Sequence, residues 1–322
     1  ALKEFMNTKE KVVVMGHRLP DADSFGAAIG IYRAAKTLNK KAYIVIDNPT
    51  SSIIPLMNTF RDNQDYEADM FVNNHEAKEI MDDNTLLVVV DTNKPSITQC
   101  EDLLYMAKMI VVLDHHRQGS DTIRNSVLSY IEPYASSASE MVAEILQYFT
   151  EGIRIRNVEA DSIYAGIMID TDNFMQKTGV RTFEAAAFLR RCGADVTRVR
   201  KLFREDMNDY KARGETIRNA ELFRGQFAIS ECPSDYVDSP TVVGAQAANE
   251  LLNIVGVKAS FVLTEYKGVI YISARAIDEV NVQIIMERMG GGGHLNMAGC
   301  QLETVNMEGA RNLLKSTLTE MQ

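Results

Sequence analysis

The sequence has no tryptophan, only four cysteines and no long apolar run, and two of these shortages exclude classes of protein. The cysteines lie far apart without a Cys-x-x-Cys pair, so we expect neither a zinc ribbon nor a disulfide framework, and a reducing cytosol fits best. The longest wholly apolar stretches, such as Leu86 to Val90 and Met109 to Leu113, are far shorter than the ~20 residues that cross a bilayer. We therefore expect a soluble chain that makes no membrane contact.

Basic residues are also in short supply, 34 against 44 acidic ones, and the net charge is −10. Such a chain is not expected to bind long nucleic acid through phosphate neutralisation. A phosphate substrate would need local cations. If four of the acids hold two divalent metals, the site becomes electropositive while the surface stays acidic.

The chain begins at Ala1 with no initiator methionine, charged leader or signal-type apolar segment before the first strand pattern. We interpret it as a fragment of a longer protein. At 322 residues, the chain is longer than a single hydrophobic core usually supports and has the length expected of two ordinary domains.

Alternation of apolar runs and helical patterns predicts the fold of the first half. A β-branched run from Lys11 to Gly16 predicts a strand, and Ala22 to Leu38 has the spacing of a helix. The apolar runs at Ala42 to Ile46, Leu86 to Val90 and Met109 to Leu113 are typical of strands buried on both faces of a parallel sheet. We predict an α/β fold with a doubly wound, mostly parallel sheet.

The later segments predict a second, smaller mixed α/β domain, which would face the first across a cleft. We place the first domain at residues 1–200, a helical connector at 201–220, which overlaps a charged helical pattern from Val196 to Arg218, and the second domain at 221–322. The helices expected in the first domain after these strands are Ser139 to Phe149, Ala160 to Ile169 and Phe183 to Arg191. The second domain would hold a strand from Phe227, a helix across Gly244 to Asn253, strands Ala259 to Glu265 and Val269 to Ala274, and the glycines Gly290 to Gly293.

The most informative motif follows the first predicted strand and contains His17, Asp21 and Asp23. In an open α/β sheet, ligands collect at the carboxyl ends of strands. One imidazole and two carboxylates within seven residues suit a hard or borderline cation. The alternative is structural: Asp23 would cap the following helix and His17 would be a loop residue.

Acid and imidazole groups recur at the ends of later elements, which favours the metal interpretation. Asp91 follows the third predicted strand, Asp114, His115 and His116 follow the next, and Asp170 closes a helix. Six ligands, His17, Asp21, Asp23, Asp91, His115 and Asp170, suffice for two cations with one bridging carboxylate and open positions for water and substrate. A carboxylate-rich set with two imidazoles points to two Mn²⁺ ions, with iron, cobalt and magnesium as alternatives.

In this order the motifs resemble those of the DHH phosphoesterase superfamily. Asp278 to His294, which contains Gly290-Gly291-Gly292-Gly293-His294, resembles the glycine-rich signature of the DHH-associated domain. Further segments are similar to the GdpP-type cyclic-di-AMP phosphodiesterases: Asp91 to Ser96, Ile131 to Ser137, Arg181 to Phe183 and Asn281 to Glu287.

The resemblance implies a bacterial enzyme that cleaves cyclic di-AMP to 5′-pApA with paired manganese ions. In that family the cytosolic catalytic module follows membrane helices and regulatory domains, so this chain would be the excised catalytic end of a membrane-anchored protein. By the family pattern, His17, Asp21 and Asp91 would hold one metal. Asp23, His115 and Asp170 would hold the other, with Asp91 bridging.

Two features depart from the subgroup. Asn93 stands where the resemblance leads us to expect histidine, and Ala298-Gly299 is closer to the nanoRNase and pAp-phosphatase branch. Four functions therefore stay open: a cyclic-dinucleotide phosphodiesterase, a hydrolase of short oligonucleotides, pApA or pAp, an inorganic pyrophosphatase, and a non-catalytic nucleotide sensor. The partner would be a small nucleotide, and the oligomeric state is open, a homodimer included.

The expected mechanism is in-line attack of a metal-bridging hydroxide on phosphorus, with Asp91 central to the site. His116 would donate a proton to the departing 3′ oxygen or bind the phosphate, and Asp114 would orient a ligating imidazole.

In the second domain, the glycine run would let the backbone approach a phosphate closely, with Gly291, Gly292 and Gly293 offering N–H groups. His294 and Arg275 would add hydrogen-bond donors and positive charge. The structural alternative is a flexible glycine turn and a solvated arginine.

Overall fold

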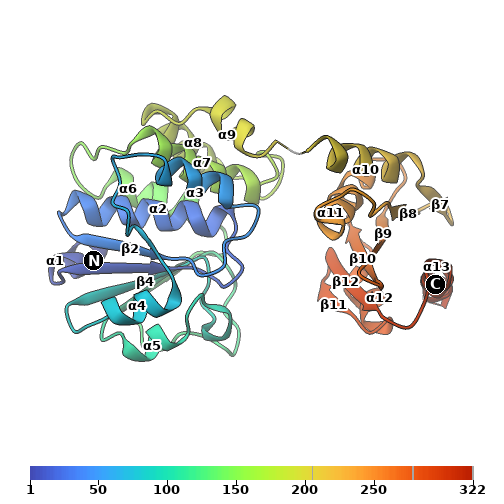
Figure 1. Ribbon diagram of the computed structural model, residues 1–322, viewed down its shortest axis with the longest axis horizontal. Coiled ribbons are helices and arrows are strands. Elements are labelled where there is room, and N and C mark those ends of the chain that lie inside the picture. The colour runs from blue at the N-terminus through green and yellow to red at the C-terminus, as the bar shows by residue number, and fades with distance from the viewer. Residues whose placement is uncertain (205, 278, 321–322) are drawn as a thin grey trace. The chain divides into compact units, whose positions relative to one another are not determined.

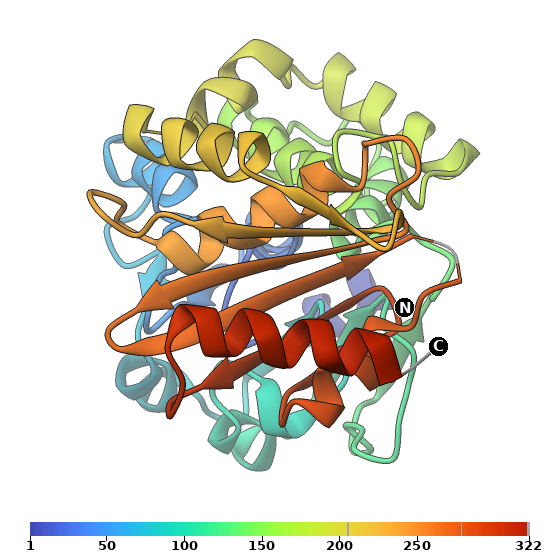
Figure 2. The same ribbon diagram turned by 90° about the vertical axis from the view of Figure 1, so that its right-hand side faces the viewer.

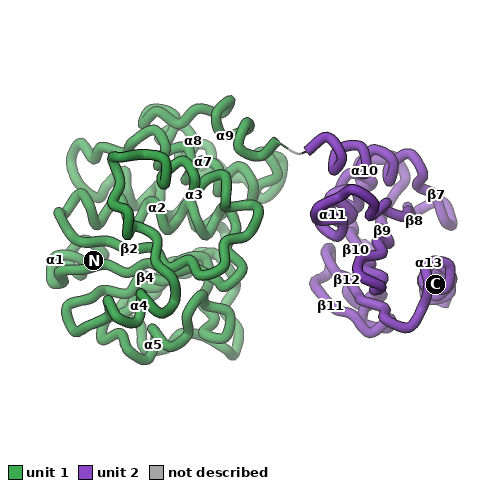
Figure 3. Tube along the Cα trace, in the orientation of Figure 1, with its two compact units in different colours: residues 1–204 green, residues 205–322 purple. Residues whose placement is uncertain are grey.

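The chain folds into two compact units, residues 1–204 and 205–322 (Figure 3). The computed structural model describes residues 1–204, 206–277 and 279–320. Asp278, the first residue of the glycine-rich signature, therefore lies outside the described residues, as does position 205 of the expected connector. Each unit has its own sheet and its own hydrophobic core.

The first unit is built on a parallel sheet of six strands in the order β3-β2-β1-β4-β5-β6. The strands are β1 (Lys11–Met15), β2 (Lys41–Val45), β3 (Phe71–Val72), β4 (Thr85–Val90), β5 (Ile110–Asp114) and β6 (Leu128–Ile131). Every residue of β4 and β5 is buried, as expected for strands covered on both faces. The strand order reverses direction between β1 and β4, and ligands collect at the carboxyl ends of such a pair. The predicted doubly wound parallel sheet is confirmed.

Helices cover both faces of this sheet (Figure 1). One face packs against the larger layer: α1 (Leu2–Asn7), α2 (Ala22–Thr37), α3 (Ile54–Arg61), α6 (Ala138–Gln147), α7 (Asn157–Asp170), α8 (Val180–Arg191) and α9 (Val196–Leu202). The other face packs against α4 (Asn74–Ile80) and α5 (Asp102–Met106), and a short 3-10 helix, η1, spans Pro95–Ile97. Sequence reasoning did not predict α1, α3, α4, α5, β3 or β6, because elements this short show no clear period.

Glycines bring α2 and α7 into close contact. A Cβ atom on Gly26 would lie 2.6 Å from the carbonyl oxygen of Ser162, and one on Gly166 would lie 3.0 Å from that of Ala22. Neither distance is a normal contact, so both positions require glycine. The approach places the start of α2 beside the end of α7 and so brings Asp23 near Asp170.

The second unit is a mixed sheet in the order β11-β12-β10-β9-β8-β7. The strands are β7 (Glu221–Phe223), β8 (Phe227–Cys232), β9 (Ala259–Tyr266), β10 (Val269–Ala276), β11 (Gly292–His294) and β12 (Met297–Leu302), and only β8 and β9 pair in parallel among these. Helices α12 (Val282–Arg288) and α13 (Met307–Glu320) cover one face, and α13 runs along the sheet in red in Figure 2. The other face packs against α10 (Met207–Arg218) and α11 (Pro240–Leu251). The predicted mixed α/β class is confirmed.

The helical pattern from Val196 to Arg218 is not continuous. It forms α9 in the first unit and α10 in the second, with Phe203 and Arg204 outside both helices. Helix α10 packs on α11 and β8, so this part of the expected connector contributes to the core of the second unit. No described helix combines the length and apolar character needed to cross a membrane.

Candidate active site

The loop between β1 and α2 carries the first three candidate ligands. Asp21 is the N-cap of α2 and accepts hydrogen bonds from the backbone N–H groups of Asp23 and Ser24 at 3.0 and 2.9 Å. The structural interpretation of Asp23 as the helix cap is therefore wrong, since Asp21 caps the helix. Asp23 lies in the first turn, 2% exposed.

Asp91 follows β4 and lies between two imidazoles. Its Oδ2 atom is 3.3 Å from Nε2 of His17, and its Oδ1 atom is 3.4 Å from Nε2 of His115. Its φ of 59° lies in the left-handed region, which is uncommon for a residue other than glycine. Such strain persists where the surroundings impose it, often at functional sites.

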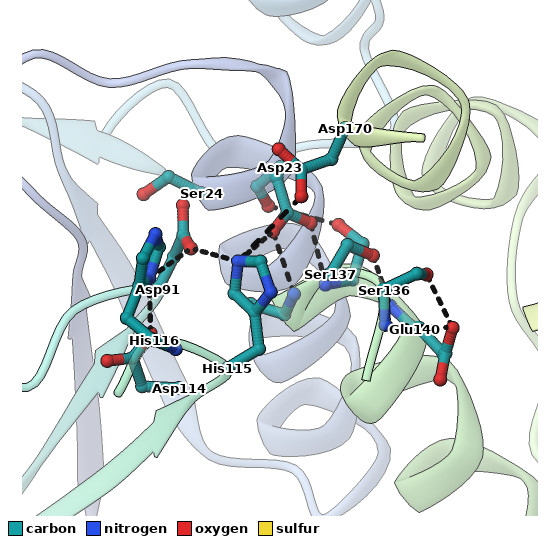
Figure 4. Close-up of polar contacts among 12 residues, drawn as sticks. Asp23, Ser24, Asp91, Asp114, His115, His116, Ser136, Ser137, Glu140 and Asp170 are labelled. Atoms are coloured by element: carbon teal, nitrogen blue, oxygen red, sulfur yellow. Dashed lines mark hydrogen bonds and ion pairs between the residues drawn. The ribbon is translucent and has the colours of Figure 1, made fainter. Parts of the chain in front are cut away.

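The six candidate ligands form two groups of three. In the first group, His17 Nε2 also lies 3.5 Å from Asp21 Oδ2, and ligand atoms of His17, Asp21 and Asp91 lie within 4.8 Å of one another. The second group contains Asp23, His115 and Asp170, and His115 Nε2 is 3.7 Å from Asp23 Oδ2 and 3.8 Å from Asp170 Oδ2. Figure 4 shows these three side chains pointing toward one another from α2, the end of β5 and the end of α7.

Crowding of carboxylates shifts the pKa values of both groups. Burial by itself lowers the pKa of His17, but Asp21 and Asp91 outweigh it and raise the pKa to about 10. Burial likewise lowers the pKa of His115, but the nearby carboxylates of Asp91, Asp23 and Asp170 outweigh it and raise the pKa to about 9. Burial and the neighbouring carboxylates raise the pKa of Asp23.

Asp170 responds to two opposing influences. Burial raises the pKa of its carboxyl group most, whereas the charges of His115 and Lys177 lower it. Lys177 was not predicted as a site residue, and it supplies positive charge beside the second group. Asp170 also ends α7, where the helix dipole disfavours a carboxylate without a nearby cation.

The side chains present fit two hard or borderline cations. Four carboxylates and two imidazoles provide the oxygen and nitrogen donors that manganese and magnesium accept. Asp91 Oδ1 and Asp170 Oδ2 are buried and have no hydrogen-bond donor among the described residues. Buried acceptors are normally satisfied, so these two atoms indicate room for a cationic partner.

His116 is arranged differently from the six ligands. Its Nδ1 atom lies 2.8 Å from Asp114 Oδ1 and 3.6 Å from Asp91 Oδ1, and its ring is 57% exposed. Asp91, His115 and His116 also form a possible metal group, but Asp114 already engages Nδ1 of His116. The imidazole that Asp114 contacts is thus that of His116, whereas the sequence suggested a ligating histidine.

The N-terminus of α6 supports Asp23 and was not predicted as part of the site. The N–H of Ala138 donates to Asp23 Oδ2 at 2.7 Å, and the N–H of Ser139 donates to Oδ1 at 2.8 Å. A helix N-terminus favours negative charge, so it holds this buried carboxylate in place. The local signal is Ser137 three residues before Glu140, where Ser137 caps the helix.

The predicted residues of the second unit do not all line one site. A hollow of about 510 Å³ is lined by Thr241, Tyr271, Ile272, Ser273, Gly290, Gly291, Gly299, Cys300 and Gln301. Gly292, Gly293 and His294 instead form β11, paired with β12, and His294 is exposed.

Close packing explains two of the glycines. A Cβ atom on Gly291 would lie 2.1 Å from the carbonyl oxygen of Gly299, and Gly293 has a φ of 150°. The glycine run therefore forms a turn followed by the edge strand β11.

Arg275 on β10 is a half-buried cation. Its Nη1 group donates to the carbonyl oxygen of Ala274 at 2.9 Å, while its buried Nε atom has no partner among the described residues. Burial lowers the pKa of its guanidinium group. The arginine is therefore not simply solvated, because part of its donor capacity is held inside the unit.

Family models match both units. Residues 11–167 match the DHH family, N-terminal domain, and residues 227–320 match the DHHA1 domain. The chain belongs to the DHH family. The resemblance drawn from the motifs is confirmed.

Relatives from two bacteria are similar along nearly the whole chain. The cyclic-di-AMP phosphodiesterase GdpP of Bacillus subtilis is 42% identical over 99% of this chain and 49% of its own length. The cyclic-di-AMP phosphodiesterase PdeA of Listeria monocytogenes is 39% identical over 99% of this chain and 49% of its own. The chain thus spans about half the length of these curated relatives.

Among solved structures, an exopolyphosphatase-related protein from Bacteroides fragilis aligns with a TM-score of 0.81 at 20% identity. The alignment covers 98% of this chain and 94% of that protein. It shows that the two proteins share a fold.

Proposed function

We propose that this chain is a manganese-dependent phosphodiesterase that hydrolyses cyclic di-AMP to 5′-pApA. The observation that carries the reaction class is the pair of ligand groups connected by Asp91, which belongs to the first group and lies 3.4 Å from His115 of the second. The substrate is proposed from relatives at 39–42% identity whose names state activity on cyclic di-AMP.

Two divalent cations would be held by the two groups, His17, Asp21 and Asp91 on one side and Asp23, His115 and Asp170 on the other. When bound, they would activate a water molecule and neutralise negative charge on the phosphoryl oxygens. Asp91 suits the shared position because its two oxygens face different imidazoles, at 3.3 and 3.4 Å. Manganese is the proposed metal since the set mixes four carboxylates with two imidazoles.

His116 is the proposed proton donor to the leaving group. The attacking water gives up a proton to solvent as its oxygen bonds to phosphorus, the P–O3′ bond breaks, and the departing 3′ oxygen takes a proton from Nε2 of His116. Asp114 accepts the hydrogen bond from Nδ1, which leaves Nε2 available to the substrate. The ring is 57% exposed, so a substrate can reach it and solvent can restore its proton.

The second unit is proposed to bind the nucleotide. Gly290 and Gly291 line the hollow with Thr241, Ser273 and Gln301, which offer hydroxyl and amide groups to a phosphate or a base. Arg275 and His294, with Gly292 and Gly293, are proposed to contribute from strands β10 and β11, which lie on either side of β12. We therefore propose that the first unit carries out catalysis and that the second unit binds the substrate.

One experiment separates the candidate functions. The purified chain is incubated with Mn²⁺ and, in parallel, with cyclic di-AMP, cyclic di-GMP, pApA, pAp or pyrophosphate, and products are resolved chromatographically. Conversion of cyclic di-AMP to pApA, abolished by a chelator and restored by Mn²⁺, is the expected result. Preference for pApA or pAp would support the nanoRNase-type alternative suggested by Ala298-Gly299, and binding without turnover would support a sensor.

The location is also a proposal. By the family resemblance, the longer protein would be anchored in the bacterial membrane with this part on the cytoplasmic side. Fractionation of cells, followed by detection of the chain in membranes and by protease protection in intact cells, tests it.

A further inference from the structure

Asn93 is a buried amide at the edge of the proposed active site. It follows β4 two residues after Asp91 and is 2% exposed. Its Nδ2 group donates to Asp114 Oδ2 at 2.6 Å and to the backbone carbonyl oxygen of His116 at 3.1 Å. Both partners are acceptors, so the amide nitrogen, not the oxygen, must face them.

Asp114 connects this amide to His116. While Asn93 occupies Oδ2, Oδ1 of Asp114 accepts from the backbone N–H of His116 at 3.1 Å and contacts its ring Nδ1 at 2.8 Å. Asp114 is fully buried. Each oxygen of the carboxylate thus has a defined partner, and rotation about its Cβ–Cγ bond would break bonds at both oxygens.

The backbone holds Asn93 in place from the other side. Its carbonyl oxygen accepts from the N–H of Ile123 at 2.9 Å, which anchors the residue to the loop after His116. The side-chain Oδ1 atom is buried and has no donor among the described residues. The identified hydrogen bonds of the side chain are therefore those of Nδ2, toward Asp114 and His116.

We propose that Asn93 is a positioning residue that acts on the reaction through Asp114 and His116. It holds the Asp114 carboxylate so that Oδ1 stays on Nδ1 of His116, which fixes the ring orientation and keeps Nε2 directed away from Asp114. The amide provides this restraint without a titrating proton of its own. The inference rests on the proposed function, in which His116 donates a proton to the leaving oxygen.

A double-mutant cycle tests whether Asn93 acts through His116. Asn93→Leu keeps the approximate shape but removes the Nδ2 donor. We expect kcat on cyclic di-AMP to fall about tenfold to a hundredfold, with KM within about twofold and bound manganese unchanged. In a His116→Ala background, Asn93→Leu should cause little further loss, because the group it positions is gone. Equal losses in both backgrounds would overturn the proposal.

Two matched variants show whether the loss is specific. Asn93→His keeps an N–H donor and should retain kcat within about threefold of the parent. Asn125→Leu is the control, because Asn125 Nδ2 also donates to a backbone carbonyl, that of Leu104 at 3.0 Å, in a place outside the site. Its kcat should stay unchanged. Loss of activity in Asn125→Leu equal to that in Asn93→Leu would indicate a general folding effect and contradict the proposal.

A second readout does not depend on turnover. Nitrogen-15 NMR of the histidine rings in the metal-free chain reports which ring nitrogen of His116 carries the proton. When the ring is neutral, as it is after the proton on Nε2 has been donated, the parent and Asn125→Leu should show one tautomer, with the proton on Nδ1, whereas Asn93→Leu should show a mixture. An unchanged His116 spectrum in Asn93→Leu would refute the positioning role. If no tested compound is hydrolysed, the proposed function fails while this spectrum still decides the role of Asn93.

Discussion

Oδ1 of Asp91 lies 3.4 Å from Nε2 of His115, and the same carboxylate reaches His17 through its other oxygen. Asp91, which follows β4, thus connects both ligand groups, and its backbone adopts the strained left-handed conformation. A substitution of Asp91 therefore alters both ligand groups at once.

Replacement of Asp91 by asparagine should therefore affect both cations. We expect bound manganese to fall from about two ions per chain to one or fewer and kcat to fall by at least about a thousandfold, because charge neutralisation is lost at both positions. Elemental analysis and steady-state kinetics measure the two effects. Asp121→Asn, an exposed aspartate after β5, is the control. Near-normal hydrolysis by the Asp91 variant would rule the arrangement out.

Manganese should stabilise the fold more at pH 8 than at pH 6. In the cation-free chain the carboxylates raise the pKa of His17 to about 10 and of His115 to about 9, against the opposing effect of burial. Both values lie above the pKa of about 6.5 that histidine has in the unfolded chain. The protonated imidazoles therefore stabilise the cation-free fold fully below that pH, and this stabilisation is lost as the pH rises through about 9 to 10.

The raised pKa values of Asp23 and Asp170 make the stability depend on pH in the same direction. The stabilisation from their protonated carboxyl groups is complete only below the pKa of an unfolded aspartate and is lost as the pH rises. Bound cations would replace these protons, so their binding should release protons and strengthen as pH rises. Thermal unfolding with and without Mn²⁺ at each pH measures the gain in Tm. A gain that is equal or smaller at pH 8 contradicts the prediction.

Gly166→Ala should destabilise the first unit and lower activity together. The added Cβ would lie 2.2 Å from Oγ of Ser139 and 3.0 Å from the carbonyl oxygen of Ala22, so α2, α6 and α7 must separate. Overpacking of this kind costs about 1–3 kcal/mol in free energy of unfolding. Urea denaturation and kcat are the measurements. Gly214→Ala in α10, where a Cβ meets no atom within 4 Å, should be neutral or stabilising.

His294→Ala should weaken substrate binding without changing metal content. His294 ends β11 beside the glycine turn and is exposed, so its removal leaves the core of the second unit intact. We expect KM for cyclic di-AMP to rise about tenfold with kcat within about threefold. His75→Ala, an exposed histidine on α4, is the matched control. An unchanged KM would show that His294 does not bind the nucleotide.

The predictable parts of the fold were those with a strong local pattern. Strands β1, β4 and β5 each contain an unbroken apolar run of four or five residues, and α2 follows a capping aspartate, so their positions agree with expectation within a residue or two. Helix α11 begins four residues before the expected Gly244, since Pro240 is well suited to a first helical turn. Elements such as the two-residue strand β3 depend on their neighbours and left no local signal.

The sequence by itself determined which side chains end the strands of the first sheet and the helix α7, because apolar runs followed by acids and histidines mark those ends directly. Only the tertiary structure decided which of them meet. The pairing of Asp114 with His116, the restraint from Asn93, and the N–H groups of α6 on Asp23 join residues up to 116 positions apart. Such contacts depend on strand order and on the close packing of α2 against α7, which no local pattern encodes.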